Sequence, residues 1–164
     1  METFFYNLHK AGAALGAIIT LVLLIKLMRG IAQKQSYDTL AQRMMLAFSG
    51  LITAEWLIGI AILIARGDFM NVPLWSHAGT MTVAAGISYL PNFWRQSEDL
   101  VRYRRSLLVV MAVMVLVAIG IVLIRGKLLG TMAVLVLVVI GIAFLEPIPK
   151  PQWEGRHIIC CLVR

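Results

Sequence analysis

The chain has 164 residues, of which 60% are hydrophobic and only 14% are charged. A soluble domain carries about 45–50% apolar and about 25% charged residues, so this composition excludes an ordinary soluble protein and indicates an integral membrane protein. The net charge is +7, and the basic residues lie mainly in short loops between apolar runs. Basic residues in such loops orient membrane spans and attract anionic headgroups. We therefore expect a lipid bilayer, and no nucleic acid, as a partner.

Five apolar stretches are long enough to cross a bilayer, whose core of about 30 Å requires about 20 helical residues. The segment 106–145 would form a single helix about 60 Å long, so it must turn back at Arg125-Gly126-Lys127 and make the last two spans a tight helical hairpin. The sequence predicts an all-α bundle of five transmembrane helices within residues 1–146 and a proline-rich tail at 147–164. The predicted spans are roughly 5–28, 44–65, 74–93, 106–124 and 128–145.

The Lys and Arg residues are unevenly divided between the two ends of these spans. Eleven fall in the loops 26–43 and 94–105 and in the tail, and four fall on the other side. Because basic residues are enriched on the cytoplasmic side, we expect the N-terminus outside and the C-terminus inside, in a bacterial plasma membrane.

The spans differ in their polarity. The third carries small and hydroxyl residues that allow close packing, so we expect it at the buried centre of the bundle, ended or kinked by Pro91. The fourth and fifth are apolar on every face, so we expect them to face lipid over most of their surface.

Two histidines are the most specific candidate for a ligand-binding site in the sequence. His9 and His77 lie about one turn inside the first and third spans. Because odd-numbered spans run in the same direction, the two histidines share the outer side. Strips of small residues follow each histidine at helical spacing and leave room for a flat ring. These candidate ring-facing residues are Gly12, Gly16 and Ala84.

This arrangement suits one haem b held between His9 and His77. Haem iron with two axial imidazoles is suited to electron transfer and has no open coordination position for a substrate. A (bacterio)chlorophyll needs only one axial ligand, so either histidine could serve it alone. The structural alternative is that both are interfacial residues and that the glycines only pack helices. The outline is loosely similar to small b-type membrane cytochromes, in two histidines on apolar helices and without a signature motif.

Glu55 lies near the middle of the second span, where an ionised carboxylate costs about 2.5–3.5 kcal/mol on insertion scales. We expect one of three roles for Glu55. It is neutral and hydrogen-bonded to Thr53, Thr80, Thr82 or a backbone carbonyl, it carries protons or contacts a quinone, or it contacts another subunit. The sequence predicts no ionisable residue of this chain beside it.

The sequence shows no nucleophile elbow, zinc-protease motif or phosphate-binding loop, so we expect no enzyme. His157, Cys160 and Cys161 match no usual zinc spacing, so no metal is expected apart from a haem iron. The leading interpretation is a small non-catalytic subunit of a larger membrane complex in energy conversion or electron transfer, a scaffold or cofactor-supporting subunit. The alternatives are the b-type cytochrome and a quinone or proton carrier that uses Glu55.

Overall fold

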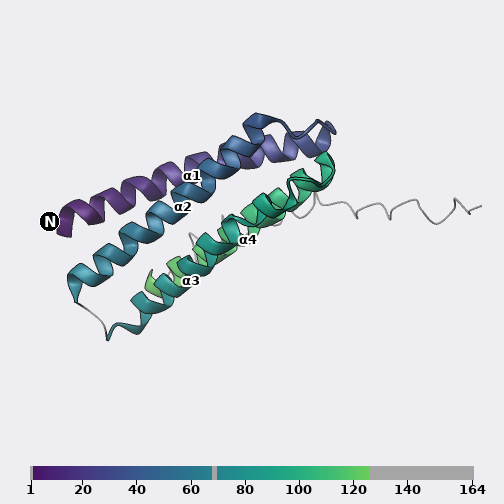
Figure 1. Cartoon of the computed structure of the whole chain (residues 1–164). Helices are drawn as coiled ribbons and strands as arrows, with labels where there is room; N and C mark the ends of the chain where they lie inside the picture. Colours follow the sequence, from purple (N-terminus) through teal and green to yellow (C-terminus); the bar gives the residue numbers. More distant parts are fainter. Residues whose placement is uncertain (1, 68–69, 126–164) are drawn as a thin grey trace, which may run out of the picture.

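The computed structural model describes residues 2–67 and 70–125, and these residues are helical apart from short connections (Figure 1). Helix α1 spans Glu2–Ala32, α2 spans Thr39–Arg66, α3 spans Val72–Ser88, the short 3-10 helix η1 spans Leu90–Trp94, and α4 spans Asp99–Arg125. The helices run up and down in turn, α1 beside α2 and α3 beside α4 (Figure 1).

Three helices are long and apolar enough to cross a membrane, which indicates a membrane location. They are Thr3–Ala32, Thr39–Arg66 and Asp99–Ile124, and they correspond to the first, second and fourth predicted spans. Large apolar side chains on their outer faces remain exposed, as contact with lipid requires. The predicted fifth span, the hairpin turn and the tail at 147–164 lie outside the described residues.

Helix α3 has 17 residues, or roughly 25 Å of helix, which is shorter than the bilayer core. It ends at Ser88, and η1 follows with Pro91 near its start. This ending agrees with the prediction, because a proline disfavours the α conformation in the residue before it. The five residues of η1 add roughly 10 Å, so α3 and η1 together match the core thickness.

The buried core departs from the sequence prediction, because α4 and not α3 dominates it. Leu107, Val110 and Val113 of α4 are fully buried, whereas Ala84 is the single α3 residue in the main apolar cluster of the described part. The fourth span is therefore more buried than the sequence suggests, with 39% of its most apolar stretch buried against 22% in α1 and 28% in α2. Its apolar residues cover every face, so the sequence contains no signal for which face is buried.

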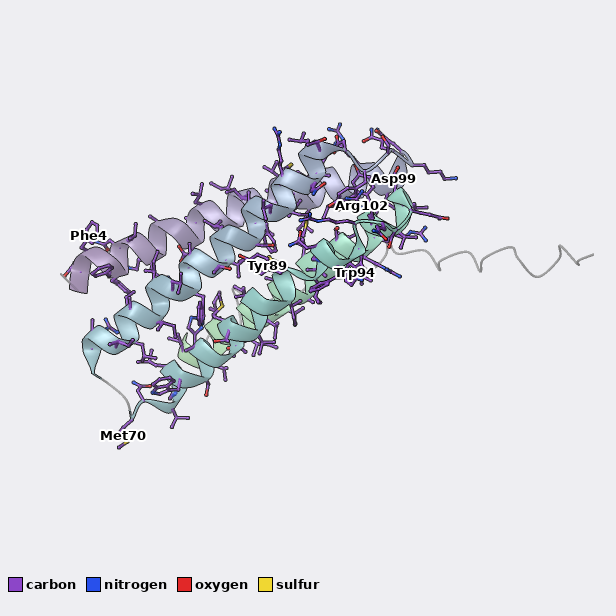
Figure 2. All side chains as sticks on the ribbon, in the orientation of Figure 1. Phe4, Met70, Tyr89, Trp94, Asp99 and Arg102 are labelled. Atoms are coloured by element: carbon purple, nitrogen blue, oxygen red, sulfur yellow. The ribbon has the colours of Figure 1, made fainter. Side chains whose placement is uncertain are left out.

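The connection between α1 and α2 and the connection between α3 and α4 both carry basic residues, and they lie at the same end of the bundle. There the hydroxyl of Tyr103 donates to the carbonyl of Ser36. Trp94, Asp99 and Arg102 mark this end in Figure 2, and Phe4 and Met70 mark the other. Asp38 caps α2 by accepting from the backbone N–H of Ala41 at 2.8 Å, and it pairs with Lys26 at 2.7 Å. The hydrogen bond from Lys26, then that from Ala41, lowers the pKa of the Asp38 carboxyl.

Candidate functional site

A cavity lies between α1, α2 and α3 at the end of the bundle where α1 begins. Its volume is about 60 Å³, which has room for a few water molecules. Its lining is mostly apolar and includes four ionisable groups, from His9, Glu55, Arg66 and His77. The lining residues are His9, Glu55, Trp56, Gly59, Ile60, Ile62, Leu63, Arg66, Leu74, His77, Ala78 and Met81.

His9 and Glu55 meet across α1 and α2. Nδ1 of His9 lies 2.7 Å from Oε2 of Glu55, and the Glu55 side chain is only 9% exposed. The distance is that of an ion pair, while the two atoms are out of line for a hydrogen bond. A small rotation of the imidazole would let its N–H donate to the carboxylate. Glu55 therefore has an ionisable neighbour within this chain, contrary to the sequence expectation.

Gly12 makes this contact sterically feasible. A Cβ added at Gly12 would lie 2.7 Å from Cδ of Glu55 and would overlap Oε1. The carboxylate therefore occupies the space that a side chain on α1 would fill. At Gly59 of α2 an added Cβ would lie 3.9 Å from Cε1 of His9, an ordinary contact distance. Of these two glycines beside the His9–Glu55 contact, only Gly12 leaves no room for a side chain.

His77 reaches the same cavity from α3, and its ring is backed by α4. A Cβ added at Gly120 would lie 2.8 Å from Nδ1 of His77 and 3.4 Å from Oγ1 of Thr80. Nδ1 of His77 is buried without a hydrogen-bond partner among the described residues. In both histidines Nδ1 is turned toward protein, toward Glu55 in one and Gly120 in the other. Nε2 is then the nitrogen that can bind a ligand.

The small residues predicted to face a ring have other positions in the described structure. Gly12 accommodates the Glu55 carboxylate, and a Cβ at Gly16 would lie 3.3 Å from a methyl group of Leu51. Ala84 is fully buried in the main apolar cluster. None of the three is among the described residues that line the cavity. Gly59 and Ala78 are the small residues that do line it.

Several site residues were not singled out from the sequence. Gly59, Met81 and Arg66 line the cavity, and Gly120 backs His77. Gly59 carried a usable signal, because it follows Glu55 by four residues and so shares its helix face. Gly120 carried none, since it lies on a distant helix.

Trp56 of α2 is fixed at the cavity wall by a bond to α3. Its Nε1 donates to Oγ1 of Thr82 at 2.9 Å. The indole therefore spans the two helices that form one side of the cavity, and it limits how far they can separate.

The chemistry of this set is that of two imidazoles facing one narrow, mainly apolar space, with a carboxylate behind one of them. Histidine ligands of metals are usually oriented in this way, by a carboxylate or a carbonyl at the other ring nitrogen. The described residues include no group of three or more His, Cys, Asp or Glu that could hold a bare metal ion. Comparisons with protein-family models, curated proteins and solved structures give no match to this chain.

Proposed function

We propose that the protein is a small membrane electron carrier that holds one haem b between His9 and His77. The observation that supports this function is that both histidines line one cavity, although they are about 68 residues apart in the sequence and lie on different helices. Two axial imidazoles complete the coordination of haem iron. When bound, the haem supplies one-electron transfer, and no open position remains for a substrate.

The donor set fits this group. Nδ1 of each imidazole is directed at protein, so Nε2 can face iron, and Glu55 provides the carboxylate that orients His9. The cavity is smaller than a porphyrin, so part of the ring would extend beyond it. Trp56, Leu63 and Met81 would exclude water from its faces.

The uneven distribution of Lys and Arg indicates how the chain is oriented in the membrane. We propose five spans with the N-terminus outside and the C-terminus in the cytoplasm of a bacterium. The basic segments 26–43 and 94–105 lie at the same end of the bundle (Figure 1), which supports this orientation. Labelling of Cys160 by a membrane-impermeant reagent on intact cells should fail. Ready labelling from outside would overturn the orientation.

We further propose that the chain acts as a non-catalytic, cofactor-supporting subunit of a larger membrane complex. The exposed apolar faces of α1, α2 and α3 support contact with lipid or with other subunits. Co-purification of the full chain with other membrane proteins in mild detergent tests this. A stable monomer recovered alone would count against it.

The haem assignment is tested by replacing each of the three histidines in turn. His9→Ala and His77→Ala should each lose the haem, measured as the haem-to-protein ratio after purification. His157→Ala is the matched control and should keep it. Loss in only one of the first two variants would contradict a bis-histidine site and would favour a pigment with a single axial ligand. Retention in both variants would exclude these residues as ligands.

A quinone or proton role for Glu55 is the second candidate, favoured by the burial of its carboxylate beside His9. Quinone that co-purifies with the wild-type chain and is lost in Glu55→Ala would support it. A wild-type chain that retains haem and carries no quinone would favour the cytochrome.

A further inference from the structure

We infer that Arg66 binds an anionic group of the ligand in this cavity, so that the haem of the proposed function lies with its propionate edge toward Arg66. This inference rests on the proposed function and adds the orientation of the ligand.

The first observation is the position of Arg66 on α2. Glu55, Gly59 and Arg66 follow one another at spacings of four and seven residues, so they share one face of the helix. Seven residues correspond to roughly 10 Å of helix. Because Gly59 lies beside the His9 ring, Arg66 stands roughly 10 Å along the helix axis from the level of the imidazole.

The second observation is the charge distribution along the cavity. Among the described residues, Arg66 is the one Lys or Arg in the lining, and it lies eleven residues beyond Glu55 on the same helix. A ligand with carboxylates at one edge would be attracted by Arg66 at that end of the cavity. The charges therefore favour one of the two ways in which such a ring could enter.

The third observation is how α2 ends. Gly67 has φ +64°, and its N–H bonds back to the carbonyl of Ile64, so the helix stops directly after Arg66. The left-handed conformation favours glycine there. Arg66 is exposed to water, so a carboxylate bound to it would keep part of its hydration. A guanidinium can bind a carboxylate through two parallel N–H donors.

The test compares two porphyrins on the full chain purified without haem in mild detergent. The probes are haem b and its dimethyl ester, which has the same ring and iron but no carboxylates. Binding is followed by the Soret absorbance. We expect the wild-type chain to bind haem b about tenfold or more tightly than the ester, because a hydrogen bond to a charged group is lost.

Arg66→Gln should weaken haem b to the level of the ester and leave the affinity for the ester unchanged. Arg43→Gln removes the same charge from the opposite end of α2 and should change neither affinity. Equal binding of the two porphyrins by the wild-type chain would overturn the inference alone, even if Arg66→Gln failed to fold. Binding of neither porphyrin would overturn the proposed function and this inference together.

Discussion

Replacing Gly12 by alanine should destabilise the protein, although alanine is the better helix former. The added Cβ would lie 2.7 Å from Cδ of Glu55 and would overlap one carboxylate oxygen. The carboxylate cannot simply withdraw, because its side chain is only 9% exposed and its other oxygen is in contact with His9. Either the helices move apart or Glu55 leaves His9.

Each route has a cost of similar size. Overpacking a filled interior costs about 1–3 kcal/mol, and a buried polar group that loses its partner costs about 1–3 kcal/mol. The gain in helix propensity from glycine to alanine offsets about 1 kcal/mol of this. We therefore expect a net loss of about 0–2 kcal/mol, centred near about 1 kcal/mol. For a chain of this length, about 1 kcal/mol lowers the melting temperature by about 2–4 °C.

The assay is thermal unfolding of the purified chain in one detergent, with Gly50→Ala as the matched control. A Cβ at Gly50 would meet no atom within 4 Å, so this variant should melt at or above the wild-type temperature. Adding Glu55→Ala to Gly12→Ala should restore part of the loss, because the overlap disappears. Equal melting temperatures for Gly12→Ala and Gly50→Ala would refute the close approach of Glu55 to α1.

Three further substitutions test other contacts. Gly120→Ala should displace the His77 ring, since the new Cβ would lie 2.8 Å from Nδ1; it should lower haem retention, and unchanged retention would argue against the backing by α4. Gly30→Ala should overlap the buried ring of Tyr103 and lower the melting temperature more than Gly12→Ala, because an aromatic ring cannot bend away. Asp38→Ala should cost about 0.5–2 kcal/mol at pH 7 through the lost N-cap, and Asp38→Asn should cost less. Because the folded-state pKa of Asp38 is lowered, its contribution is present above the unfolded pKa and is lost as pH falls through the folded value, so wild type and Asp38→Ala should converge in acid.

The sequence was sufficient for the long helices but not for their packing. Continuous apolar runs predicted α1, α2 and α4, since length and hydrophobicity are local properties. The burial of Leu107 and Val110 could not be predicted, because a helix that is apolar all round shows no preferred face. The shortness of α3 follows from the ending at Ser88 ahead of Pro91, which the sequence did indicate.

At the site, the sequence predicted the residue types and that His9 and His77 lie at the same end of parallel helices. Their shared cavity could not be predicted, because it depends on how α1, α2 and α3 pack. The sequence placed Glu55 near the middle of its span and His9 near the end of another, so it did not predict that the two side chains meet. The sequence does not contain the axial offset between α1 and α2, and this offset brings His9 to the level of Glu55.

The central claim is that His9 and His77 hold one haem b, and an absorption spectrum tests it most directly. The full chain is expressed with ample haem, purified in mild detergent and measured before and after addition of dithionite. The account predicts a Soret band in the oxidised protein and a sharp α band on reduction, at one haem per chain. A colourless preparation would contradict it.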